Sequence, residues 1–112
     1  AALTINRIID VFPAEEKDMV RAMLSESLRA VISQTLLKKN GGGRVAAHEI
    51  MMGTPAIRNL IRENKIAQMY SAIQTGQQFG MQTLDQCLQG PLKDGVISRT
   101  EAQMKAANKD AF

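Results

Sequence analysis

Apolar side chains recur at helical spacing in the first part of the chain. Ile5, Ile8, Ile9 and Phe12 follow the i, i+3, i+4, i+7 rule, and they predict a helix that ends before Pro13. A second helix is predicted directly after this proline, because acidic side chains crowd the turn where the helix dipole favours negative charge. Its buried side is expected to carry Met19, Val20, Met23 and Leu24.

The hydrophobic period changes in the middle of the chain. Val31–Lys39 reads VISQTLLKK and contains several β-branched residues, and Arg44–Met52 reads RVAAHEIMM, with an apolar or small residue at most positions. The glycine-rich run 40–43 between them favours a turn, since glycine tolerates positive φ. These features predict an antiparallel β-hairpin over residues 31–52, although the start of its first strand is also compatible with a helix.

The segment Gly53–Glu63, GTPAIRNLIRE, contains the features of a well-defined helix start. Thr54 fits the N-cap position, and Pro55 fits the first helical position, where a missing N–H costs nothing. We predict an amphipathic helix over 54–63, for which pattern alone favours an ordinary core helix with a solvated face. Its apolar stripe consists of Ile57, Leu60 and Ile61, and its polar side of Arg58, Asn59, Arg62 and Glu63.

Helical spacing returns after residue 64 and predicts helices over 65–74 and 81–93. The second of these should kink or end near Gln89, because Pro91 would clash with the carbonyl of Cys87. Ser98 and Glu101 are spaced as a capping box and predict a last helix, after which residues 107–112 are expected to fray. The expected fold class is therefore mainly α with one antiparallel β-hairpin, in a single domain over residues 1–112.

Bulk properties limit the class of protein. The chain has 112 residues, 45% of them hydrophobic, which suffices for one domain with a core. No apolar run approaches the roughly 20 residues of a membrane span, and no signal peptide is recognisable. Cys87 is the single cysteine, which fits a reducing, cytosolic compartment. The chain lacks a starting Met, which is compatible with a piece of a longer protein.

Residue types that carry chemistry are few and scattered. The run Gly41–Gly43 lacks the Lys and the hydroxyl of a phosphate-binding loop and lies between two predicted strands. His48 has no second His or Cys beside it, and its neighbour Glu49 would point to the opposite face of the strand. Cys87 lies in an apolar helical stripe, where an inert thiol is expected. The residues alone therefore predict no catalytic, cofactor-binding or metal site in this chain.

Two other functions remain compatible with the pattern. Residues 84–106 outline two helices joined by a short turn, with Arg99 and Lys105 on the second, as in a helix-turn-helix DNA-binding module. Glu101 near the start of that second helix and the modest net charge of +3 argue against nucleic acid as a partner. A plain oligomerisation domain is the other alternative.

The run AIRNLIRE, Ala56–Glu63, resembles the signature of the type IV pilus retraction ATPases, the PilT family. Three longer segments resemble the C-terminal part of that family in the same order and spacing. They are RIIDVFPAEEKDMVRAMLSESLRAVISQTLLKK (Arg7–Lys39), GGGRVAAHEIMMGTPAIRNLIRE (Gly41–Glu63) and AQMYSAIQTG (Ala67–Gly76). The likeness covers nearly the whole chain and fades after about Leu88. Asn64 departs from it, because the family usually has an acid at this position.

This resemblance implies that the chain is the C-terminal portion of a RecA-like α/β ATPase domain, whose sheet the hairpin would extend. In isolation, the edge of that hairpin could pair with another copy. The family's Walker A loop, its acidic segments that bind Mg²⁺ and activate water, and its histidine segment would lie upstream. ATP and Mg²⁺ would accordingly be cofactors of the longer protein only, and this chain alone should not hydrolyse ATP.

The resemblance also implies a role. Members of the family form homohexamers at the cytoplasmic face of the inner membrane and convert ATP hydrolysis into pilus retraction and twitching motility. The expected partners are therefore other copies of the chain and the inner-membrane platform protein at the pilus base. The motif is associated with retraction, so the expected interaction residues are Ala56, Ile57, Arg58, Asn59, Leu60, Ile61, Arg62 and Glu63.

Overall fold

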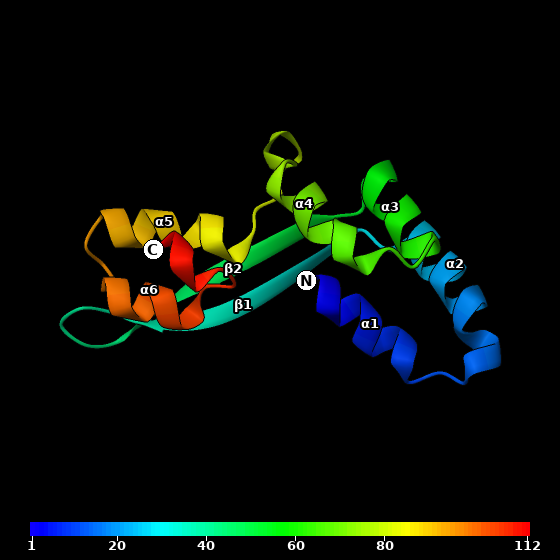
Figure 1. Cartoon of the computed structure of the whole chain (residues 1–112), viewed down its shortest axis with the longest axis horizontal. Helices are drawn as coiled ribbons and strands as arrows, with labels where there is room; N and C mark the ends of the chain where they lie inside the picture. Colours follow the sequence, from blue (N-terminus) through cyan, green and yellow to red (C-terminus); the bar gives the residue numbers. More distant parts are fainter.

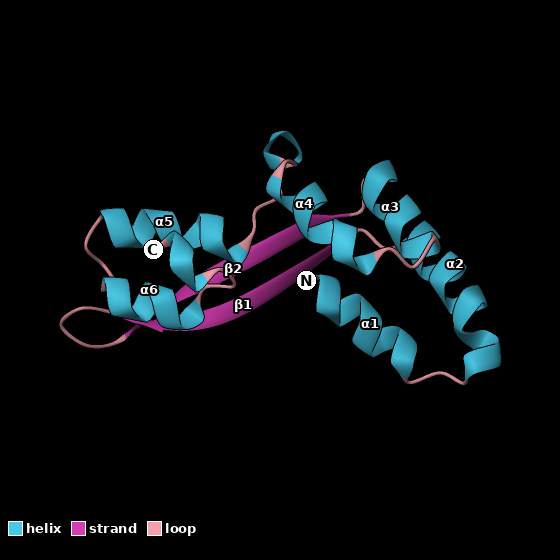
Figure 2. Ribbon diagram, viewed as in Figure 1, coloured by secondary structure: helices cyan, strands magenta, loops and turns pink.

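The computed structural model describes residues 1–112 and has helices around both ends of a long two-stranded hairpin (Figure 1, Figure 2). The α-helices are α1 (Ala2–Asp10), α2 (Lys17–Ser27), α3 (Pro55–Arg62), α4 (Met69–Gln74), α5 (Leu84–Lys93) and α6 (Arg99–Lys105). The strands are β1 (Ala30–Lys38) and β2 (Arg44–Met52), and the 3₁₀ turns are η1 (Ala14–Glu16), η2 (Ile66–Gln68), η3 (Gln77–Phe79) and η4 (Lys109–Ala111). The predicted fold class is confirmed. No helix has the length and apolar character needed to cross a bilayer.

The hairpin pairs nine residues of each strand in antiparallel register, from the pair Ala30–Met52 to the pair Lys38–Arg44. Its loop depends on glycine, because Gly41–Gly43 all have positive φ, between 79° and 108°. A residue with a Cβ rarely adopts such angles. The glycine run therefore acts as the turn that sets the register of the two strands.

The two faces of the hairpin differ in exposure. Successive side chains of a strand point to opposite faces. At odd positions the side chains are buried or half-buried, and Leu37 and Ala47 are fully buried under the helices. At even positions β1 is exposed, and it presents Ile32 and Leu36 to solvent. One face of the hairpin therefore carries the helices, and the opposite face of β1 is open.

The first hydrophobic core lies at the end of the hairpin where the chain enters β1 and leaves β2. Helices α1, α3 and α4 contribute to it, and α2 packs along α3 on its outer side (Figure 1). Burying each large aliphatic side chain stabilises the folded state by about 1.5–3 kcal/mol. The buried members of this core are Ile5, Ile9, Met51, Ile57, Ile61, Met69, Ile73 and Met81.

A second, separate core lies toward the loop end of the hairpin, under α5 and α6 (Figure 1). Its buried members are Leu37, Ala47, Leu88, Ile97, Ala102 and Ala106. The two cores share no buried residue, so the hairpin is the element that joins them. The molecule is elongated as a result, with extents of 51, 29 and 23 Å along its principal axes.

Helix α5 contradicts one prediction. It does not end near Gln89 but continues through Gly90 and Pro91 to Lys93. A residue before proline normally avoids the helical conformation, because its Cβ meets the proline ring. Gly90 has no Cβ, and Pro91 lies in the last turn, where few helical hydrogen bonds remain to be lost. Glycine at position 90 therefore helps the helix to continue past the proline.

Two further predicted features take a different form. The predicted helix 65–74 begins only after Lys65, whose ψ of 57° is not helical, and it consists of the 3₁₀ turn η2 followed directly by α4. At the start of α6, Ser98 Oγ accepts a hydrogen bond from Glu101 N at 3.1 Å. The carboxylate of Glu101 does not complete the predicted capping box, and its Oε1 is buried without a partner.

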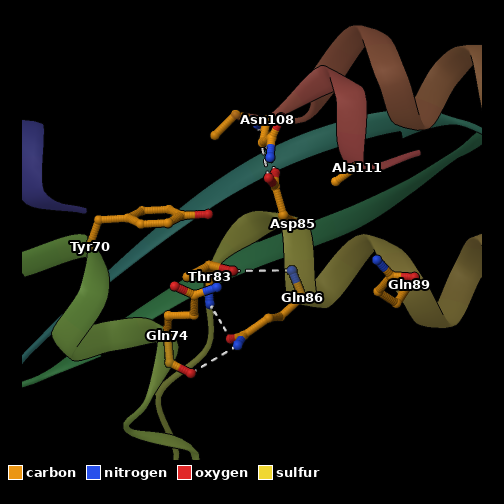
Figure 3. Close-up of a pocket in the computed structure, with 9 residues that line it drawn as sticks. Tyr70, Gln74, Thr83, Asp85, Gln86, Gln89, Asn108 and Ala111 are labelled. Carbon is orange, nitrogen blue, oxygen red and sulfur yellow. Dashed lines mark hydrogen bonds between the residues drawn. The ribbon is translucent and has the colours of Figure 1, made fainter.

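Residues 107–112, for which the sequence predicts fraying, are bonded to the second core region (Figure 3). The carboxylate of Asp85 accepts hydrogen bonds from Ala107 N at 2.7 Å and from Asn108 N at 2.9 Å. Gln103 Nε2 donates to the carbonyl of Phe112 at 2.6 Å. Hydrogen bonds to a charged acceptor are stronger than neutral ones, so Asp85 is the main attachment point of this segment.

Gly53 brings the exit of the hairpin close to the chain that follows α2. Its N–H donates to the carbonyl of Arg29 at 2.8 Å. A Cβ built at position 53 would lie only 2.3 Å from the carbonyl oxygen of Leu28. Real Cβ atoms do not approach a backbone oxygen so closely, so the position requires glycine for space. This contact places Arg29 next to the start of α3.

We expect Gly53→Ala to destabilise the chain by about 3 kcal/mol, because the backbone around Leu28 must move to admit the methyl group. The control is Gly80→Ala, whose Cβ would meet no atom within 4 Å and whose cost is limited to its positive φ. We expect that cost to be about 1 kcal/mol. Urea unfolding followed by circular dichroism measures both changes. Equal losses of unfolding free energy in the two variants would contradict the close contact.

We expect Asp85→Asn to accelerate amide hydrogen exchange at Ala107 and Asn108 by about tenfold, because the charged acceptor of both N–H groups is lost. The control is Gln89→Ala, an exposed position on the same helix that makes no hydrogen bond to the tail. Its exchange rates should match those of the parent chain. Unchanged exchange in Asp85→Asn would show that the carboxylate does not hold this segment.

Candidate functional site

Helix α3 carries the motif Ala56–Glu63, and local bonds fix where it begins. Thr54 Oγ1 accepts a hydrogen bond from Ile57 N at 3.3 Å, and Pro55 occupies the first helical position. Thr54 thus provides an acceptor for an N–H group that has no partner within the helix, and Pro55 has no N–H group that needs one. The start of the helix is therefore determined by the sequence next to it.

The end of α3 is equally well defined. Asn64 adopts the left-handed conformation with φ of 58°, and Lys65 N donates back to the carbonyl of Leu60 at 2.9 Å. This pattern is a Schellman helix end, in which asparagine is one of the few residues that tolerate the left-handed position. Asn64, which departs from the family resemblance, thus suits the backbone at this point.

The apolar side of α3 is packed into the first core. Ile57 and Ile61 are fully buried, and Leu60 is half-buried against the same core. The remaining motif residues face outward. Arg58 is half-buried, and the exposed residues are Ala56, Asn59, Arg62 and Glu63. The motif is thus divided into an anchoring side and an accessible polar side.

A cleft of about 370 Å³ lies at the start of α3. Two of its lining residues are arginines, one from the motif and one from the segment between α2 and β1. The complete lining is Arg29, Met52, Gly53, Thr54, Arg58 and Phe79. The contact of Gly53 with the backbone at Leu28 and Arg29 is what brings these segments together.

Neither arginine of the cleft is neutralised within the chain. Arg58 makes no ion pair, and its Nε is buried without a hydrogen-bond partner. Arg29 is exposed and also makes no ion pair. The ion pairs of the chain join Lys17 to Asp10, Arg21 to Asp18, Lys65 to Glu63, and Ala1 N to Glu49. The cleft is therefore a site of uncompensated positive charge.

The sequence predicts the position of Arg58 but gives no signal for Arg29 or Phe79. Arg29 lies between α2 and β1, and Phe79 lies in the short turn η3 after α4. No helical or strand spacing relates these positions to the motif. Only the steric demand at Gly53, a glycine without positive φ, could have indicated that another segment approaches here.

The largest cavity, of about 640 Å³, lies between α4, α5 and the C-terminal segment (Figure 3). Three of its polar side chains, those of Thr83, Asp85 and Gln86, bind backbone groups. Thr83 and Gln86 form a reciprocal capping box, and Gln86 Nε2 also donates to the carbonyl of Gln74 at 2.9 Å. Asp85 holds the backbone of residues 107 and 108. These three side chains stabilise local structure, whereas the side chains of Tyr70, Gln74, Gln89 and Asn108 also line the cavity and make no hydrogen bond within the chain.

The other residues singled out from the sequence have structural surroundings. His48 Nε2 lies 3.1 Å from Gln34 Oε1 on the facing strand. Cys87 is half-buried, and its Sγ accepts a bond from the His48 N–H at 3.5 Å. No group of three or more His, Cys, Asp or Glu side chains is placed to hold a metal ion. The polar side of α3 is therefore the stronger candidate for a functional surface.

The helix-turn-helix alternative gains no support from the arrangement of α5 and α6. Both helices pack on the hairpin, α5 along β2 and α6 along β1 (Figure 1). Glu101 is buried at the start of α6 rather than available to a base edge.

Comparison with known proteins identifies the relatives of this chain, although no family profile matches it. The type IV pilus retraction ATPase PilT of Pseudomonas aeruginosa is 71% identical over 112 residues, which are 100% of this chain and 33% of that protein. A twitching motility protein of Neisseria gonorrhoeae is 60% identical over 113 aligned positions, covering 100% of this chain and 30% of its own length. The chain thus spans about a third of the relatives it matches.

A solved structure shares the fold. The crystal structure of the pilus retraction motor PilT with bound ADP superimposes with a TM-score of 0.86 at 43% identity, covering 100% of this chain and 31% of that one. Both matches extend over the whole chain, and so they cover the segment Ala56–Glu63. The predicted resemblance is therefore confirmed: over its whole length the chain matches one part, about a third, of proteins of the PilT family.

Proposed function

We propose that this chain is the coupling part of a pilus retraction motor, which transmits ATP-driven motion to the pilus machinery. The observation that carries the proposal is the division of α3 into two sides. Ile57 and Ile61 fix the helix in the first core, while the polar side chains remain free to contact a partner. A helix held this firmly would move as one body with the domain that carries it.

The partners proposed for the whole protein follow from its family. It would act as a homohexamer at the cytoplasmic face of the inner membrane, where α3 would meet a neighbouring subunit, another domain or the platform protein at the pilus base. Exposed polar residues around a half-buried arginine suit such a contact, since arginine is enriched at interfaces. The residues assigned to it are Arg58, Asn59, Arg62 and Glu63.

ATP and Mg²⁺ would be bound by other parts of the longer protein. The residues of this chain do not suit them: the glycine run Gly41–Gly43 is the turn between β1 and β2, and no helix follows it to bind phosphate. No step of ATP hydrolysis is therefore assigned to the 112 residues described here. Their proposed task is mechanical: they would transmit the motion that ATP hydrolysis elsewhere in the longer protein produces.

We expect Arg58→Ala in the full-length protein to leave ATP binding and hydrolysis unchanged and to reduce pilus retraction by about tenfold, because an arginine at an interface commonly carries much of the contact energy. Nucleotide binding, ATPase rate and twitching zones measure these effects. The control is Arg44→Ala, an exposed arginine at the loop end of the hairpin, which should retain retraction. Loss of nucleotide binding in Arg58→Ala would refute the assignment of this side chain to coupling.

We expect Leu60→Asp to abolish retraction through local unfolding, because it places a carboxylate against the first core at a cost of about 3 kcal/mol or more. Thermal unfolding and protease sensitivity near α3 measure the loss. Leu60→Met conserves the volume and should preserve both folding and retraction. A Leu60→Asp protein that is folded and still retracts pili would contradict the anchoring role of this side of the helix.

A further inference from the structure

We propose that the cleft between Arg29 and Arg58 binds an acidic segment of a protein partner, which places an Asp or Glu carboxylate between the two guanidinium groups. The inference rests on the proposed function, because it names the chemistry of the partner that α3 contacts. It also extends the site beyond the motif, since Arg29 and Phe79 lie outside Ala56–Glu63.

The charge of the cleft points to an anionic ligand. Arg29 and Arg58 line one cavity, and no carboxylate of the chain pairs with either of them. Arg58 is half-buried, so its charge is less well solvated than that of a surface arginine. Guanidinium groups bind carboxylates through two parallel hydrogen bonds, which is the strongest pairing that such side chains make.

The backbone at the start of α3 argues against a phosphate group as the ligand. Phosphate sites at helix starts use several free N–H groups. Here Ile57 N is bonded to Thr54 Oγ1, and Arg58 N is bonded to the carbonyl of Thr54. Pro55 has no N–H to offer. Ala56 contributes the one remaining amide of this turn, and one amide does not form a phosphate cradle.

The remaining lining favours a protein segment over a free carboxylate ion. Phe79 is 55% exposed at the cleft although it is a large aromatic residue, and Met52 is half-buried beside it. These two side chains offer an apolar surface next to the arginines. A partner that presents an acidic residue beside an aliphatic or aromatic one would satisfy both parts of the cleft, as interfaces with a charged anchor and an apolar contact do.

The test uses the exposed phenylalanine as a photochemical probe. In cells that produce the full-length protein, Phe79→p-benzoylphenylalanine is irradiated, and crosslinked peptides are identified by mass spectrometry. We expect a crosslink to a segment that contains Asp or Glu. Combining the probe with Arg29→Glu or with Arg58→Gln should reduce the crosslink yield by about tenfold, because a like charge or an unpaired carboxylate then lies in the contact.

A second probe position controls for folding. Phe12→p-benzoylphenylalanine lies outside the cleft, in an apolar groove between α1 and α2, and its crosslinks should be the same with and without the arginine substitutions. With that control satisfied, two results would overturn the inference. They are Phe79 crosslinks that persist in both arginine variants, and crosslinks to a segment without an acid.

The result is separable from that of the proposed function. If the Arg58→Ala protein retracts pili normally while the Phe79 crosslinks still depend on the arginines, the proposal of an acidic partner is supported and the coupling role is refuted. If Arg58→Ala abolishes retraction while the crosslinks are indifferent to charge, the coupling role stands and the acidic partner is refuted.

Discussion

The pairing of β1 with β2 is the interaction on which the rest of this structure depends. A two-stranded hairpin alone is at best marginally stable in water. Here each end of the ladder is covered by a different core, with Met51 buried in the first and Leu37 and Ala47 in the second. The cores stabilise the hairpin, and the hairpin is what connects them. Slipping β2 by one residue against β1 would turn both Met51 and Ala47 to the opposite face of the hairpin.

The position of α3 follows from this arrangement. The hairpin ends at Met52, and Gly53 turns the chain directly into the helix while touching the backbone that leads from α2 into β1. Entry to and exit from the hairpin are therefore held together at one point. That point also gathers Arg29 and Arg58 from distant parts of the sequence, so the same steric constraint that orders the fold creates the charged cleft.

Local signals in the sequence were sufficient for elements whose determinants are close along the chain. Thr54 and Pro55 define the start of α3, and the glycine run defines the hairpin. Prediction failed where a neighbouring residue removes a steric clash: Gly90 has no Cβ to meet the ring of Pro91, so α5 continues past the proline. It also gave no indication of contacts between distant segments. Residues 107 and 108 bind Asp85, and Arg29 approaches the motif. Both contacts depend on tertiary packing, which the spacing of apolar residues along the chain does not indicate.

The length of the hairpin determines how a rotation at one end would move the other end. Nine extended residues in each strand form a twisted rod about 30 Å long, which can lengthen little because its backbone is already extended. With one end fixed in the first core, a rotation of about 10° would displace the glycine turn at the other end by about 5 Å, by simple geometry on that length. A rod of this length therefore converts a small rotation at one end into a larger linear displacement at the other end.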